Sequence, residues 1–157
     1  MTPQEKTERY RAVAQEIAAV VDGETNMVAR MATVSNLLHH AFDHFFWTGF
    51  YCVDAEKTSE LVVGPYQGTM GCLRIPFGKG VCGTAAQDKK AVIVDNVHDF
   101  PGHIACDANS LSEIVVPVIS GDGTMIAVLD VDSDREAMFD DTDRQHLEAI
   151  IEASFSS

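Results

Sequence analysis

The stretch SEIVVPVISGDGTMIAVLDVDS, residues 112–133, contains two apolar, β-rich runs on either side of the turn GDG at 121–123. A glycine-rich turn between two such runs is typical of a β-hairpin. Side chains alternate between the faces of a strand, so Asp130 and Asp132 are expected on the same face. Glu113 begins the first run and is expected to lie across from them. The stretch therefore predicts an antiparallel pair with three carboxyl groups at one end.

The sequence around this hairpin predicts further strands and several helices. Capping and periodicity signals predict helices after Thr2, after Thr25, after the glycine-rich turn at 78–80 and from Asp140. Strand-like runs are FFWTGFYCVD, ELVVGPYQG, GCLRIPF and AVIVDNV. We expect one α+β domain over residues 1–157, with a mostly antiparallel central sheet of about five to six strands and helices packed on one face.

Charge and hydropathy exclude several classes of protein. The formal net charge of −13 argues against nucleic acid and against an anionic membrane surface, because both require basic patches. No stretch approaches the roughly 18 apolar residues of a membrane span, and the first ten residues do not resemble a signal peptide. We therefore expect a cytoplasmic domain.

The four cysteines, Cys52, Cys72, Cys82 and Cys106, are the unusual feature of the composition. None of them forms a Cys-x-x-Cys pair, and the histidines show no ligand spacing, so we expect neither a bound metal nor another cofactor. Cys52 lies in an aromatic strand and is expected to be a buried apolar residue. Cys106, in contrast, lies in the polar loop FPGHIACDANS, which favours a reactive thiol.

The segment GKGVCG at 78–83 matches the pattern G-x-G-x-x-G. That pattern binds dinucleotides only within a βαβ unit, and the helix expected here is short, so a tight turn is the simpler interpretation. The helix N-terminus could still offer backbone N–H groups to a small carboxylate. It could also lower the pKa of the Cys82 thiol, which keeps this cysteine as an alternative participant in the chemistry.

Two interpretations remain open for the acids and for the aromatic residues of the first strand. Asp130 and Asp132 could simply be a polar strand end, or they could line a pocket that binds a cation or transfers a proton. Trp47 and Tyr51 share one face of their strand, where core packing is the default and a wall against a ligand is the alternative.

Three segments together resemble a known family. VGPYQGTMGCLRIPFGKGVCGTAA, VDNVHDFPGHIACDANSLSEIVVPV and AVLDVDS are similar to the free methionine-(R)-sulfoxide reductases, which are catalytic GAF domains. The resemblance spans Phe45 to about Asp143, and the three cysteines Cys72, Cys82 and Cys106 fall at the family spacing. The run CDANSLSE departs mildly from the small-residue run that the family has after its cysteine, a change confined to residues 108–109.

The resemblance implies roles for two cysteines. Cys106 would be the nucleophile that attacks the sulfoxide sulfur and becomes a sulfenic acid. Cys72 would be the resolving cysteine, and the resulting disulfide would be reduced by thioredoxin. Whether Cys82 also takes part, in place of or beside Cys106, stays open at this point.

It also implies roles for the acids and the aromatic residues. Glu113 and Asp132 are the candidates for protonating the sulfoxide oxygen. Asp130 would hold the substrate's ammonium group, and Trp47, next to Tyr51, would pack against its methyl end.

Two other classes of function compete with this hypothesis. A non-catalytic GAF sensor would bind a small ligand and signal to a partner, although the chain ends at Ser157 with no output domain and sensing does not require three cysteines. A nucleotide-dependent enzyme would rest on the glycine turn alone. A homodimer is compatible with the sequence, which does not decide the oligomeric state.

Overall fold

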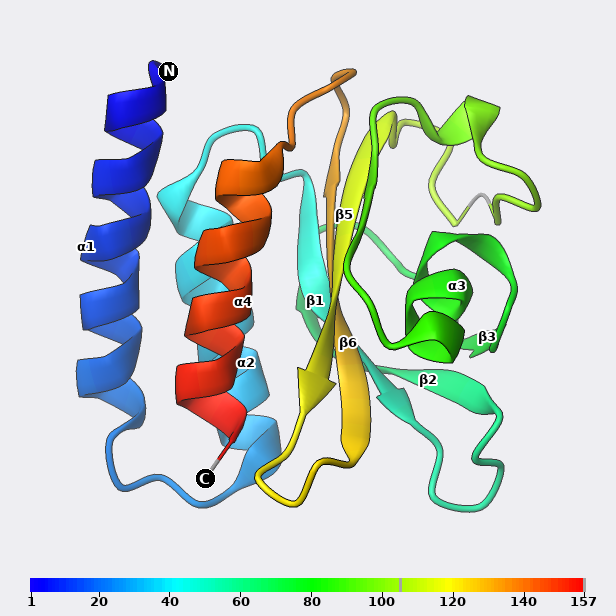
Figure 1. Ribbon diagram of the computed structural model, residues 1–157, viewed down its shortest axis with the longest axis horizontal. Helices are drawn as coiled ribbons and strands as arrows, with labels where there is room; N and C mark the ends of the chain where they lie inside the picture. The colour runs from blue at the N-terminus through cyan, green and yellow to red at the C-terminus, as the bar shows by residue number, and fades with distance from the viewer. Residues whose placement is uncertain (105, 157) are drawn as a thin grey trace.

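The computed structural model describes residues 1–104 and 106–156, and its central feature is a β-sheet (Figure 1). The strands are β1 Trp47–Val53, β2 Glu60–Gln67, β3 Arg74–Pro76, β4 Val92–Val94, β5 Ser112–Ile119 and β6 Met125–Ser133. The helices are α1 Pro3–Val21, α2 Met27–Ala41, α3 Gly80–Asp88 and α4 Asp141–Phe155, with a 3-10 turn, η1, at Val97–Asp99. The six strands follow the order β3-β2-β1-β6-β5-β4, and every neighbouring pair is antiparallel. The α+β class and the mostly antiparallel sheet are confirmed.

The predicted hairpin is formed by β5 and β6. Its register places Glu113 opposite Asp132 and Val115 opposite Asp130. On its other side β6 pairs with β1, where Trp47 lies opposite Asp132. The three acids and the tryptophan therefore meet at one end of three adjacent central strands, because residues with the same parity on paired strands share a face.

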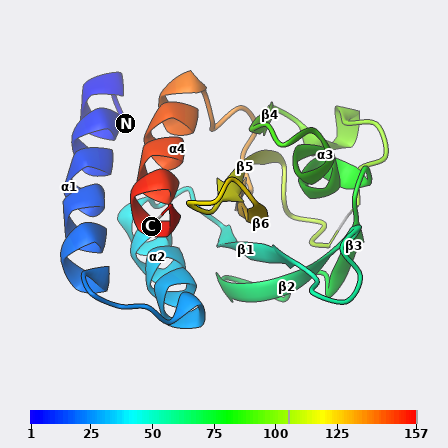
Figure 2. The same ribbon diagram turned by 60° about the horizontal axis from the view of Figure 1, so that its bottom comes forward.

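The other face of these strands is apolar and carries the long helices. Ile114, Val116 and Val118 alternate along β5 with residues of the face that carries the acids, and Leu129 does the same on β6. These four side chains pack in the core with α2 and α4. Helix α1 lies outside this layer and packs on α2 and α4 (Figure 2).

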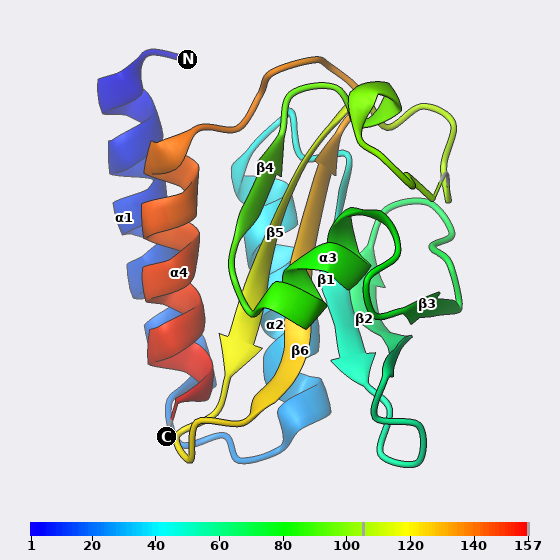
Figure 3. The same ribbon diagram turned by 45° about the vertical axis from the view of Figure 1, so that its right-hand side comes forward.

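The expected arrangement, with helices on one face, holds for α1, α2 and α4, whereas α3 covers the opposite face (Figure 3). Val81, Ala85 and Ala86 of α3 are buried there against a second apolar cluster that includes Val115 and Val128. The sheet is thus buried on both sides. Within the part of the chain that the structure describes, no helix is long and apolar enough to cross a membrane.

The two ends of the chain are joined through Asp143, the third residue of α4. The expected N-caps are present: Thr2 forms a capping box with Glu5, and Asp140 forms one with Asp143. The buried Asp143 carboxylate also accepts hydrogen bonds from Lys6 Nζ at 2.7 Å and from the Tyr10 hydroxyl at 2.5 Å.

We expect Asp143→Ala to lower the free energy of unfolding by about 3 kcal/mol, because it removes a cap, leaves the buried Tyr10 hydroxyl without its acceptor, and leaves Lys6 only the exposed Asp140 as a partner. Urea unfolding followed by circular dichroism measures the loss. Asp141→Ala is the matched control, since Asp141 is exposed and pairs with Arg144 in solvent, where ion pairs contribute little. Equal losses for the two variants would contradict this account of the contact between α1 and α4.

Candidate active site

A pocket lies on the α3 side of the sheet, at the end where the acids meet. Strands β1, β5 and β6 form its floor, α3 forms one wall, and the loops before β3 and β5 form its rim. Seven of the residues predicted for the site line this pocket: Trp47, Tyr51, Cys82, Cys106, Glu113, Asp130 and Asp132. The eighth, Cys72, is covalently attached to one of them.

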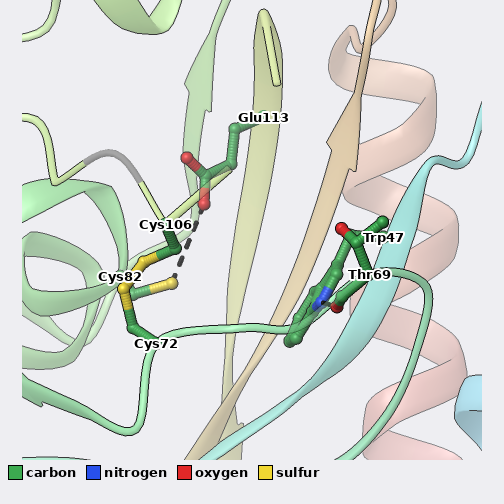
Figure 4. Close-up of a disulfide and its surroundings, with 6 residues drawn as sticks. All are labelled: Trp47, Thr69, Cys72, Cys82, Cys106 and Glu113. Atoms are coloured by element: carbon green, nitrogen blue, oxygen red, sulfur yellow. Dashed lines mark hydrogen bonds between the residues drawn. A yellow bond between two sulfur atoms is a disulfide. The ribbon is translucent and has the colours of Figure 1, made fainter. Parts of the chain in front are cut away.

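Cys72 and Cys106 form a disulfide at the rim (Figure 4). Their Cα atoms lie 5.2 Å apart although 34 residues separate them in the sequence. Cys72 comes from the loop between β2 and β3, and Cys106 from the loop between η1 and β5. Cys106 is exposed and Cys72 is half-buried, so the bond is accessible to a reductant in solution. The pair is the one that the family resemblance implies; its catalytic role stays a prediction.

Contacts that the sequence analysis missed hold the two rim loops together. The Trp47 indole Nε1 donates a hydrogen bond to the backbone carbonyl of Thr69 at 2.8 Å (Figure 4). The Thr69 hydroxyl in turn donates to the Asp107 carboxylate at 2.5 Å, which connects the Cys72 loop to the residue after Cys106. The only signal in the sequence was that Asp107 flanks Cys106, and nothing marked Thr69.

Gly71 allows the Cys72 loop to approach the aromatic floor of the pocket. A Cβ atom at this position would lie 2.9 Å from both Trp47 Cζ2 and the Tyr51 hydroxyl, closer than real contacts allow. The rings of Trp47 and Tyr51 stack with their centroids 5.5 Å apart and also pack in the core around α3. Both interpretations of this pair therefore apply, since the rings belong to the core and line the pocket.

The three acids are buried together, with 5–8% of each residue exposed. Burial raises the pKa of Asp130 well above its usual range, and the neighbouring carboxyls of Asp132 and Glu113 raise it further. Burial and the Glu113 carboxyl likewise raise the pKa of Asp132. These two groups therefore retain protons at pH values where an exposed aspartate is fully ionised. Among the described residues, Asp130 Oδ1 has no hydrogen-bond partner, so a ligand can supply one.

Cys82 lies on the first turn of α3 with its thiol inside the pocket. Its Sγ is 3.8 Å from Glu113 Oε2, in hydrogen-bonding contact (Figure 4). The expectation that the helix N-terminus lowers its pKa is wrong. Burial raises the pKa of the Cys82 thiol, and the charges of Asp130 and Glu113 raise it further, so it stays protonated.

The glycine pattern at 78–83 serves the packing of α3 on the sheet. Helix α3 has nine residues and connects β3 to β4, which lie at opposite edges of an antiparallel sheet, so the βαβ unit of a dinucleotide site is not formed. A Cβ on Gly83 would lie 2.4 Å from the Pro76 carbonyl oxygen. The N-terminus of α3 nevertheless lines the pocket through Lys79 and Gly80, where backbone N–H groups and a lysine can meet an anion.

Comparison with known proteins identifies the domain type. The family model described as "GAF domain" matches residues 27–153. The free methionine-R-sulfoxide reductase of Saccharomyces cerevisiae is 44% identical, covering 82% of this chain and 74% of the yeast protein. The Escherichia coli enzyme of the same name is 42% identical, covering 93% of this chain and 86% of that protein.

A solved structure supports the same assignment as the two enzymes from yeast and E. coli. The X-ray structure of the Neisseria meningitidis free methionine-R-sulfoxide reductase in complex with its substrate is 47% identical, with a TM-score of 0.89 and coverage of 94% of this chain and 87% of that one. The three relatives match this chain in sequence over 82–94% of its length, and the solved structure also matches its fold. The chain therefore belongs to the GAF domain family and, within it, to the free methionine-R-sulfoxide reductases.

Proposed function

We propose that this protein reduces free L-methionine-(R)-sulfoxide to methionine in the pocket between α3 and the sheet. The observation that carries the proposal is the accessible Cys72–Cys106 disulfide at the rim of a pocket whose floor holds three buried carboxyl groups. A sulfoxide reductase needs a thiol to take the oxygen and an acid to protonate it, and both occur here. The names of the yeast and E. coli relatives support the same substrate.

Each part of a free amino acid has a suitable partner in this pocket. The Asp130 carboxyl, whose Oδ1 has no hydrogen-bond partner among the described residues, suits the substrate's ammonium group. The N-terminus of α3 at Lys79 and Gly80 suits its carboxylate. The stacked rings of Trp47 and Tyr51 suit the methyl and methylene groups beside the sulfur. A residue inside a polypeptide lacks both free termini, so this arrangement favours the free amino acid.

The chemistry proceeds in two steps. In the first, the Cys106 thiolate attacks the sulfoxide sulfur while Asp132 or Glu113 protonates the oxygen. The attack forms a bond between Sγ and the substrate sulfur; the hydroxyl then passes to Sγ as this bond and the S–O bond break. Methionine leaves and Cys106 is a sulfenic acid, so the substrate gains the two electrons that Cys106 loses. In the second, the Cys72 thiol attacks the sulfenic sulfur, water leaves, and the disulfide forms.

A dithiol protein of the thioredoxin type then reduces the disulfide and restores both thiols. The exposure of Cys106 supports this step, because exchange requires direct attack of an incoming thiolate on sulfur. Cys52 and Cys82 are free thiols, which suits a reducing compartment, and we place the reaction in the cytoplasm.

We expect the R epimer of free methionine sulfoxide to be consumed and the S epimer to give no turnover above background. The acids lie together on the floor of the pocket and Cys106 lies at its rim, so one epimer alone presents its oxygen to the acids while its sulfur faces Cys106. Chiral chromatography of methionine and of both sulfoxides, with thioredoxin, thioredoxin reductase and NADPH present, measures this. A methionine sulfoxide placed within a peptide is the control. Equal rates on both epimers would refute the assignment, and binding without consumption of reductant would indicate a sensor.

A further inference from the structure

Two of the acids in the pocket, together with the Cys82 thiol, which the proposed reduction does not use, form a second arrangement of donors. Cys82, Glu113 and Asp130 each place one ligand atom, a thiol sulfur or a carboxylate oxygen, so that all three lie within 4.8 Å of one another. All three residues are buried, and they come from α3, β5 and β6. We propose that these residues bind a thiophilic divalent cation, with Zn²⁺ as the representative ion.

The spacing of these donors fits a small tetrahedral ion. With Zn–S near 2.3 Å and Zn–O near 2.1 Å, neighbouring ligand atoms of a tetrahedral site lie about 3.5 Å apart. Cys82 Sγ and Glu113 Oε2 are 3.8 Å apart, so an ion can bridge them with little movement. Three protein ligands leave a fourth position for water on the open side of the pocket, as in zinc sites with an exchangeable ligand.

A second observation also indicates a missing ligand at this place. Asp130 Oδ1 is buried and, within residues 1–104 and 106–156, has no hydrogen-bond partner. A buried polar oxygen without a partner is costly, and a cation that displaces the carboxyl proton satisfies it directly. The thiol decides the type of cation, because sulfur selects zinc over the hard ions magnesium and calcium. On binding, the Cys82 thiol and the protonated Asp130 carboxyl each lose a proton to solvent and coordinate as a thiolate and a carboxylate.

The absence of a Cys-x-x-Cys pair and of histidine spacing led to the expectation of no metal. Such spacing identifies only metal sites whose ligands lie close together in the sequence. These three ligands lie 17 to 48 residues apart along the chain, so no local pattern marks them. Because Glu113 and Asp130 also belong to the proposed substrate site, the ion and the substrate would exclude each other. Binding itself requires no turnover, so it is tested independently of the proposed reduction.

The experiment uses the disulfide form of the full chain, in which Cys72 and Cys106 cannot coordinate. Competition with a chromophoric zinc chelator should show one Zn²⁺ bound per chain and no binding of Mg²⁺. Cys82→Ala and the isosteric Asp130→Asn should each weaken zinc binding by more than about 100-fold, since even the loss of an outer-shell partner costs 10- to 100-fold. Cys52→Ser should bind zinc like the wild type, because Cys52 lies on the other side of the sheet.

Circular dichroism confirms that each variant is folded before its affinity is compared. Loss of zinc binding in folded Cys82→Ala and folded Asp130→Asn, with retention in Cys52→Ser, supports the site. No zinc binding by the wild-type disulfide form, or undiminished binding by Cys82→Ala, would overturn it.

Discussion

Cys106→Ser should release no methionine from free methionine-(R)-sulfoxide, even in a single turnover, because burial raises the pKa of Cys82, the other free thiol that lines the pocket, and keeps it protonated. Cys72→Ser should instead release about one methionine per chain, since the sulfenic acid on Cys106 forms before a resolving thiol is needed. With thioredoxin this variant should then stall, because thioredoxin requires a disulfide. A small thiol that reaches the sulfenic acid directly should restore part of the turnover.

A quenched burst measurement on each reduced variant, followed by mass spectrometry of the oxidised cysteine, distinguishes these outcomes. Cys52→Ser is the control and should behave like the wild type, because this cysteine packs next to Met31 in the core on the other side of the sheet. A full burst from Cys106→Ser would show that Cys82, and not Cys106, is the nucleophile. The structure argues against that outcome, since burial and three nearby carboxyl groups raise the pKa of Cys82 and keep it a thiol.

The second large effect is expected at the buried acids. Glu113→Gln, Asp130→Asn and Asp132→Asn should each lower turnover, and replacing the proton donor should cost roughly 100-fold or more. These substitutions keep shape and hydrogen bonding but remove the acid, which lets the proton-transfer role be separated from packing. Steady-state kcat and KM of each variant are the readout. Loss mainly in KM would assign a residue to ammonium binding, as proposed for Asp130, and loss mainly in kcat would assign it to proton transfer.

The pH dependence gives an independent check on the donor. Burial and a neighbouring carboxyl raise the pKa of Asp132, so its protonated form persists to higher pH and is lost as the pH rises through that raised value. If Asp132 is the donor, this alkaline loss of activity should disappear in Asp132→Asn. Near-wild-type activity in all three acid variants would instead show that the three acids have no catalytic role and are only a polar strand end.

The acid cluster could be predicted from the hairpin pattern alone. Alternation along residues 125–133 placed Asp130 and Asp132 on one face, and antiparallel pairing placed Glu113 across from them, as the register confirms. The same reasoning placed Trp47 and Tyr51 on one face of β1. Such local periodicities are determined by backbone geometry and are readable in sequence without knowledge of the whole fold.

The features that the sequence did not reveal depend on contacts between distant segments. The approach of Cys72 to Cys106 requires two loops on either side of α3 to meet, and only the family resemblance indicated it. The covering of the second sheet face by α3 buries Cys82 among acids and reverses the expected shift of its pKa. The contact of Thr69 with Asp107 joins loops 38 residues apart, and neither residue type carries a signal for it.

The most direct test of the account uses the wild-type protein, fully reduced and then given one equivalent of free methionine-(R)-sulfoxide without any reductant. Peptide mapping by mass spectrometry and quantification of methionine are performed on the same sample. We expect about one methionine per chain and a disulfide between Cys72 and Cys106, with Cys52 and Cys82 recovered as free thiols. Absence of released methionine, or oxidation of Cys82 with Cys106 still reduced, would contradict it.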